Sequence, residues 1–162
     1  MSDFDSNNLR QFLIEAKRHT YAAVDASAVI VTSAFPGGHQ LEYAEGDFSY
    51  RDLYYGGYFF VGQETVHFRQ RPVWSMAYSG GNPAELIGKY PGDEFSQFLR
   101  AVLRQLPAEH PYRGPAAMQS GLFSYQNQIE GTFDHFWGHE IISYGDLGRI
   151  YQLHYSGGAI RE

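Results

Sequence analysis

The chain has 162 residues and no cysteine, which suits a single domain over 1–162 and excludes disulfides, thiol nucleophiles and thiolate metal sites. Its 12 Lys and Arg residues are scattered and outnumbered by 18 Asp and Glu residues, which argues against a nucleic-acid partner. Because no apolar stretch reaches the ~18 residues of a membrane span and the N-terminus lacks a secretory signal, we expect a cytoplasmic protein without a membrane partner.

The first predicted element is an amphipathic helix near the N-terminus. Ser6 to Asn8 offer capping groups, and an apolar stripe at helical spacing follows them: Leu9, Phe12, Leu13 and Ala16. Residues 22–46 are rich in small residues and glycine and are expected to form a connection. Within it, Val29-Ile30-Val31 offers a short extra strand.

Three or four antiparallel strands are expected between residues 48 and 81, where apolar and polar residues alternate between turn signals. Alternation assigns one set of side chains to the inner face of the sheet. This set is largely aromatic and consists of Phe48, Tyr50, Asp52, Tyr54, Phe60, Gly62, Glu64, Val66, Phe68, Trp74, Met76 and Tyr78.

The same order of elements is predicted again in the second half. A second helix starts at Pro91-Gly92-Asp93, carries an apolar stripe and stops at Pro107. After a connection over 107–120, strands follow with a second inner-face set: Phe123, Tyr125, Asn127, Ile129, Phe136, Gly138, Glu140, Ile142, Tyr144, Tyr151, Leu153 and Tyr155.

The strand ends WSMAYSGG (74–81) and YQLHYSGG (151–158) align, and the alignment extends back through both sets. We interpret this as an internal duplication with repeat units about 8–81 and 92–158. Each unit is a helix followed by a three-to-four-strand antiparallel unit. The predicted fold is therefore α+β, a bent antiparallel sheet with two helices across one face.

The segments YRDLYYGGYFFVGQE, PVWSMAYSGG and PYRGP, with the closing F-x-G-x-E and YSGG, resemble an uncharacterised bacterial domain-of-unknown-function family. The resemblance runs from about Phe12 to Ile160. Some members of that family carry the domain behind a helix-turn-helix module. By analogy, the resemblance implies a sensing or partner-binding role.

Four polar side chains interrupt the aromatic inner face, and the alignment places Asp52 opposite Asn127 and Glu64 opposite Glu140. Burying an unpaired carboxylate costs several kcal/mol, so such groups must be paired, protonated or open to a water-filled pocket. The ligand-binding candidates are these four residues and the aromatic residues around them: Tyr50, Tyr54, Trp74, Tyr78, Tyr125, Tyr151 and Tyr155.

The alternative is that these carboxylates brace the fold. They would then accept hydrogen bonds from tyrosine hydroxyls, backbone amides or the side chains of Arg51 and Arg113. We favour bracing for each Glu taken singly. For Asp52 and Asn127 the two interpretations are closer, since losing the charge in one copy suggests that the halves have specialised.

The histidines His135 and His139 form H-x-x-x-H, which on a helix would place two imidazoles on one face. Alternation and flanking glycines favour a strand instead, on which the rings would stand ~13 Å apart. We therefore predict no metal and no cofactor. The two histidines should lie on the outer face, where Trp137 covers the sheet or a partner.

Three functions follow from these observations. The first is a non-enzymatic, sensor-like domain whose aromatic, acid-lined cavity binds a cationic or hydroxyl-rich small molecule. The second is an acid–base enzyme, an isomerase or hydrolase, using Glu64, Glu140 and Asp52. The third is a protein-partner module such as an antitoxin or immunity-type protein, favoured if Tyr55, Tyr58 and Trp137 point outward. A homodimer is compatible with the sequence.

Overall fold

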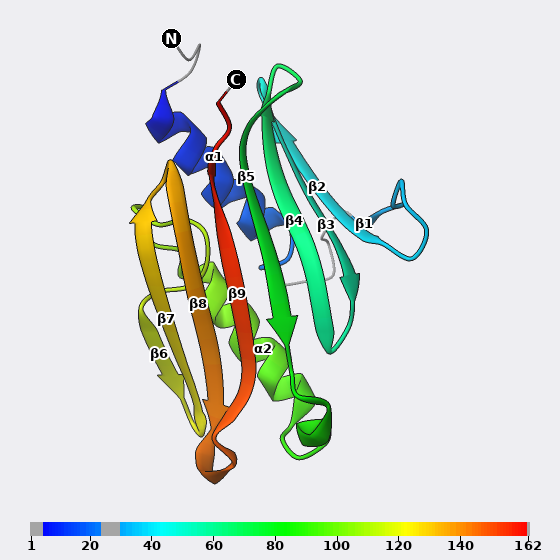
Figure 1. Cartoon of the computed structure of the whole chain (residues 1–162), viewed down its shortest axis with the longest axis vertical. Coiled ribbons are helices and arrows are strands. Elements are labelled where there is room, and N and C mark those ends of the chain that lie inside the picture. The colour runs from blue at the N-terminus through cyan, green and yellow to red at the C-terminus, as the bar shows by residue number, and fades with distance from the viewer. Residues whose placement is uncertain (1–4, 24–29, 162) are drawn as a thin grey trace.

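The computed structural model describes residues 5–23 and 30–161. Its frame is a nine-stranded antiparallel sheet in the order β1-β2-β3-β4-β5-β9-β8-β7-β6. Figure 1 shows helices α1 and α2 lying across the same face of this sheet, while its other face carries no helix. The predicted α+β fold, with a bent antiparallel sheet and two helices across one face, is confirmed.

The elements follow one another in the predicted order, a helix and then strands, twice. In the first half these are α1 (Ser6–His19), β1 (Ile30–Val31), β2 (His39–Glu45), β3 (Phe48–Gly56), β4 (Phe59–Phe68) and β5 (Arg71–Gly81). In the second half they are α2 (Gly92–Arg104), β6 (Ala117–Ser120), β7 (Phe123–Thr132), β8 (His135–Tyr144) and β9 (Arg149–Ala159).

The two halves of the sheet meet where β5 pairs with β9. In this pair Tyr78 lies opposite Tyr155, and the two tyrosines are equivalent in the sequence alignment. The other registers agree in the same way, since Asp52 pairs with Glu64 across β3 and β4, and Asn127 pairs with Glu140 across β7 and β8. Residues that are equivalent in the sequence alignment therefore also occupy equivalent positions in the sheet.

Both helices bury the predicted apolar stripes against the sheet. The N-cap of α1 is Asp5, whose side chain accepts from the Asn7 amide at 3.0 Å, so the prediction of a cap within Ser6 to Asn8 is wrong. Asp5 lies one residue earlier and still offers a carboxylate to the first free N–H groups. Two buried residues of α1 were not predicted: Ile14, and Lys17, which lies four positions after Leu13.

Two strands form inside segments predicted as connections. Strand β2 occupies part of 22–46 and β6 part of 107–120, so both segments are shorter than predicted. Both strands have mixed or mostly exposed side chains, and each is fixed by pairing with the next strand along the chain. Their periodicity is therefore weak. The suggested strand at 29–31 exists at Ile30–Val31, while Val29 lies outside the described residues.

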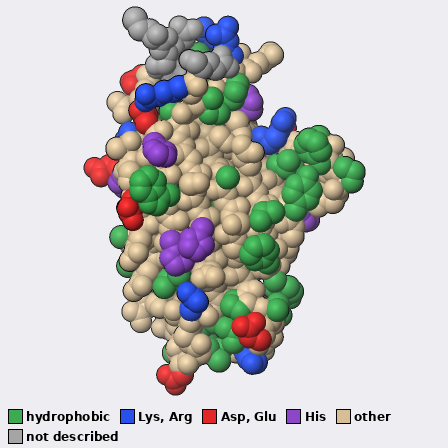
Figure 2. Space-filling model, in the orientation of Figure 1, with side chains coloured by type: hydrophobic (Ala, Val, Ile, Leu, Met, Phe, Trp, Pro, Cys, Tyr) green, Lys and Arg blue, Asp and Glu red, His purple; other side chains and the backbone are tan. Residues whose placement is uncertain are grey.

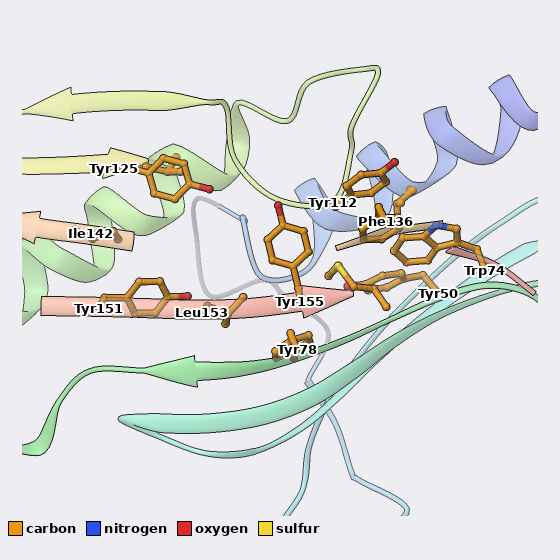
Figure 3. Close-up of a cluster of buried hydrophobic side chains, with 14 of the residues drawn as sticks. Tyr50, Trp74, Tyr78, Tyr112, Tyr125, Phe136, Ile142, Tyr151, Leu153 and Tyr155 are labelled. Atoms are coloured by element: carbon orange, nitrogen blue, oxygen red, sulfur yellow. The ribbon is translucent and has the colours of Figure 1, made fainter. Parts of the chain in front are cut away.

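The inner-face residues are buried or half-buried, as alternation predicts. At one end of the core, Trp74 packs against the stacked rings of Tyr112 and Phe136 (Figure 3). The ring centroids of Tyr112 and Phe136 are 3.6 Å apart. Figure 3 also shows Tyr151, Leu153 and Tyr155 in succession along β9, all on this face. The aromatic composition thus fills the space between sheet and helices.

Two inward glycines let tyrosine rings cross a strand. Gly62 lies opposite Tyr78, and Gly138 opposite Tyr155. Each ring passes over its glycine, so that a Cβ atom at Gly138 would overlap the ring of Tyr155. This crossing carries each tyrosine hydroxyl to a polar side chain one strand further on.

Replacing Gly138 with alanine should therefore lower the free energy of unfolding by about 1–3 kcal/mol, since Tyr155 is buried and cannot move aside easily. Urea denaturation of wild type and variant measures this. The matched control is Gly57→Ala, because a Cβ there meets nothing within 4 Å. Equal losses in the two variants would show that the close packing of Tyr155 has no energetic weight.

Candidate functional site

The Glu64 carboxylate forms an ion pair with Lys17, in the space between α1 and the sheet. Lys17 Nζ lies 2.7 Å from Glu64 Oε2 and also donates to the backbone carbonyl of Tyr112 at 2.6 Å. Both charged side chains are almost completely buried. Burial lowers the pKa of Lys17, and the attraction of Glu64 opposes that shift.

The equivalent carboxylate, Glu140, has three side-chain partners. Arg113 donates to Oε1 at 2.5 Å, Tyr151 donates to the same oxygen at 2.9 Å, and Tyr125 donates to Oε2 at 2.7 Å. Burial and the Glu140 charge raise the pKa of Tyr125 and Tyr151 above their usual range, so both hydroxyls stay donors. These contacts are those of the bracing alternative. Arg51, by contrast, pairs with the surface residue Glu42.

Asp52 and Asn127 occupy equivalent positions but have different surroundings. The Tyr78 hydroxyl donates to Asp52 Oδ1 at 2.6 Å, and the Tyr155 hydroxyl donates to Asn127 Oδ1 at 2.7 Å. Asn127 also donates to the Gly114 carbonyl at 3.1 Å. Asp52 has no ion pair with any residue that the structure describes.

The charge on Asp52 is therefore poorly compensated. Burial and the nearby Glu64 carboxylate raise the pKa of Asp52 to about 7. The Tyr78 hydrogen bond and the more distant Lys17 and Arg113 charges oppose this shift. Near neutral pH, Asp52 can consequently exist in either protonation state.

Asp52 lies at the wall of a cavity of about 420 Å³, which we call the inner cavity. It is located on the helix-covered side of the sheet, where residues of β3, β4, β5 and β9 line it together with Leu99 of α2. Its wall is formed by Tyr21, His39, Asp52, Tyr54, Gly56, Gly57, Phe60, Tyr78, Leu99, Arg113 and Tyr151.

The inner cavity contains some of the predicted ligand-binding candidates and not others. Asp52, Tyr54, Tyr78 and Tyr151 line it. The remaining candidates are buried elsewhere in the core and do not line it: Tyr50, Glu64, Trp74, Tyr125, Asn127, Glu140 and Tyr155. In particular, the two glutamates lie behind the cavity wall in their ion pairs.

Seven wall residues were not predicted as ligand contacts: Tyr21, His39, Gly56, Gly57, Phe60, Leu99 and Arg113. Tyr21 and His39 come from segments without clear periodicity, and Arg113 from the connection before β6. Leu99 belongs to the apolar stripe of α2 and Phe60 to the predicted inner face of the sheet, while Gly56 and Gly57 lie where β3 turns into β4. These residues show no regular spacing in the sequence, and only the tertiary fold brings them together.

The outer face of the sheet carries the histidines, as strand alternation predicts. His139 stacks on His154 with ring centroids 4.2 Å apart, and Trp137 is exposed. Figure 2 shows histidines near the middle of this face and charged side chains mostly toward its margins. Over residues 5–23 and 30–161, no group of three or more His, Asp or Glu side chains could hold a metal ion.

A hollow of about 630 Å³ beside these histidines is lined partly by small side chains such as Ala77, Ser79 and Ser156. Its one carboxylate, Glu130, is exposed to solvent. Of these two hollows, only the inner cavity has buried charged side chains, Asp52 and Arg113, in its wall. The inner cavity is therefore the better candidate site.

The fold and the site together define an α+β domain with an aromatic, acid-containing cavity beneath its helices. The chain belongs to the DUF5680 family of domains of unknown function, whose family model matches residues 52–160. That range includes Asp52, Glu64 and Glu140, but not Lys17 or Tyr21. No curated protein and no solved structure matches the chain. Neither described helix has the length and apolar character needed to cross a membrane.

Proposed function

We propose that this domain binds a small molecule in the inner cavity and acts as a cytoplasmic, sensor-like module. The observation that carries the proposal is the position of Asp52, a buried carboxyl group at the wall of an otherwise mostly aromatic cavity. A volume of about 420 Å³ lies within the range usual for small-molecule sites, about 300–1,000 Å³. The resemblance to domains that follow helix-turn-helix modules fits a sensing role.

The difference between the two halves supports this assignment. We infer that the halves arose by duplication, and their equivalent registers support that origin. In the second half, the Asn127 side chain donates to the Gly114 carbonyl and accepts a hydrogen bond from the Tyr155 hydroxyl. In the first half, Asp52 keeps a charge and faces a cavity. The first half has thus specialised for binding, and the second for bracing.

An acid–base enzyme is a second candidate, and it would use Asp52 rather than the glutamates. Glu64 and Glu140 are held in ion pairs behind the wall. Asp52 lines the cavity, and its pKa of about 7 suits proton transfer near neutral pH.

A protein-partner module is the third candidate. It is favoured by the exposure of Tyr55, Tyr58 and Trp137, at 39%, 62% and 47%. These side chains lie outside the inner cavity, so a surface partner and a small ligand need not compete.

A library screen by thermal shift tests the proposed function. Compounds that bind the inner cavity should raise the unfolding temperature of the wild type, and Leu99→Trp should abolish this response because an indole there fills the cavity. Gln97→Trp is the matched control, since it adds the same ring to an exposed position of the same helix. Compounds that stabilise the wild type and Leu99→Trp equally would place their binding outside the inner cavity and contradict the proposal.

A further inference from the structure

The buried charges of the domain are not balanced. Three carboxyl groups are buried, Asp52, Glu64 and Glu140, but only two cationic side chains are buried with them within residues 5–23 and 30–161. Lys17 pairs with Glu64 and Arg113 with Glu140. The stretches 1–4, 24–29 and 162 contain no lysine, arginine or histidine that could supply a third cationic side chain. Asp52 is the carboxyl group without a cation.

This unbalanced carboxyl group is also the one that a ligand can reach. Glu64 and Glu140 do not line the inner cavity, whereas Asp52 does. The second half of the fold has the neutral Asn127 at the equivalent position, so the excess negative charge is confined to the cavity. A ligand that brings a positive charge would complete the pairing pattern that the other two carboxylates already have.

Aromatic rings surround the position where such a charge would lie. Tyr54, Phe60, Tyr78 and Tyr151 line the cavity, and Phe60 is in ring contact with each of the other three at centroid distances of 6.0 to 6.5 Å. The faces of aromatic rings attract cations, most strongly where water is excluded. The Asp52 carboxylate and the aromatic rings of the cavity wall therefore both favour a cationic ligand.

Resting on the proposed function, we propose that the inner cavity binds a small organic cation with N–H groups, a protonated amine or an amidinium, which pairs with Asp52. The N–H groups would donate to the carboxylate, and the organic part would contact the rings. This assigns a ligand class to the cavity and gives Asp52 a binding role that Glu64 and Glu140 do not share.

Arg113 also lines the cavity, and its charge would oppose a cation. Its guanidinium is committed to Glu140 at 2.5 Å and lies over the ring of Tyr21, 5.5 Å from the ring centroid. The Arg113–Glu140 pair is neutral as a unit, as is the Lys17–Glu64 pair. The repulsion from each cation is therefore offset by its own carboxylate, and Asp52 determines the net charge at the wall.

The proposal makes binding dependent on pH. The groups that act on Asp52 are Glu64 on β4, Tyr78 on β5, Lys17 on α1 and Arg113 before β6. Together with burial they give the free protein an Asp52 pKa of about 7, so binding a cation must displace a proton at lower pH. Affinity should rise about tenfold from pH 6 to pH 8 as the carboxylate becomes available. His39 is exposed, lines the cavity and stacks on Tyr54, so the pH dependence of binding should persist in the His39→Gln variant if Asp52 is its source.

Three probes of nearly equal size and shape test the charge preference: benzamidinium, benzamide and benzoate. In NMR titrations of the full chain, benzamidinium should bind about ten- to a hundredfold more tightly than the other two, because only it offers a charged donor to Asp52. Asp52→Asn should remove this preference while keeping the Tyr78 hydrogen bond. Asp146→Asn, which removes one exposed carboxylate, is the matched control and should leave the preference unchanged.

The outcomes separate this proposal from the proposed function. Tighter binding of benzamide or benzoate than of benzamidinium, abolished by Leu99→Trp, would overturn the cation preference but support binding in the cavity. Equal benzamidinium affinity in wild type and Asp52→Asn would overturn the pairing with Asp52. If none of the three probes binds, the cation proposal fails, and the charge-independent library screen decides the proposed function by itself.

Discussion

Replacing Lys17 with methionine is expected to lower the free energy of unfolding by about 3–5 kcal/mol. The substitution keeps most of the length of the side chain but leaves the Glu64 carboxylate without its cation in a site that water does not reach. It also leaves the Tyr112 carbonyl without the Lys17 donor. Urea denaturation at neutral pH, followed by circular dichroism, measures the loss.

Two further variants separate the ion pair from other effects of the substitution. Adding Glu64→Gln to Lys17→Met should restore much of the lost stability, because the unpaired charge is then gone. Arg18→Met is the matched control on the same helix. Arg18 makes an exposed pair with Glu15, and its loss should cost less than about 1 kcal/mol. A Lys17→Met variant as stable as Arg18→Met would show that the buried pair contributes little.

The second large effect is expected for Asp52→Asn, which should change how stability depends on pH. In the wild type, the pKa of Asp52 rises from 3.8 to about 7 on folding, so the folded state holds the proton more tightly than the unfolded state. The carboxyl group therefore has no destabilising effect below about pH 4. Its cost grows as the pH rises toward 7 and is constant above that, reaching about 4 kcal/mol.

Asparagine has no charge to desolvate, so the variant should gain stability relative to the wild type as the pH rises from 4.5 to 8. The Tyr78 hydrogen bond should persist, because Asn127 accepts the equivalent bond from Tyr155. Unfolding free energies measured at several pH values give the difference, with Asp146→Asn as a control that should show no trend. A difference between Asp52→Asn and wild type that does not change with pH would be inconsistent with a raised pKa. A carboxyl group that costs stability in this way fits a binding role better than a bracing role.

The main features of the fold could be predicted because they depend on local periodicity. Alternation along β3, β4, β7 and β8 identified the inner face, and helical spacing identified α1 and α2. The strands β2 and β6 were missed, since short strands with exposed polar residues have little periodicity of their own. These two strands form because they pair with β3 and β7.

The candidate site could be predicted only in part, for a related reason. Asp52 and Glu64 were identified because a polar residue on an apolar face stands out in a strand. Lys17 also interrupts an apolar stripe, and that signal was available on α1, four residues after Leu13. Arg113 and Tyr21 lie in irregular segments. Their positions depend on the path of the chain between elements, which periodicity does not determine.

The central position of β9 has a consequence for synthesis of the chain. Among the described strands it is the last to be synthesised, yet its pairing with β5 over residues 152–159 is the only strand pairing between the two halves of the described sheet. Until β9 is complete, β5 presents an unpaired edge, and such edges are templates for aggregation. A nascent chain would therefore be vulnerable between the synthesis of β5 and that of β9, and a chaperone that shields β5 during this interval should raise the yield of folded protein.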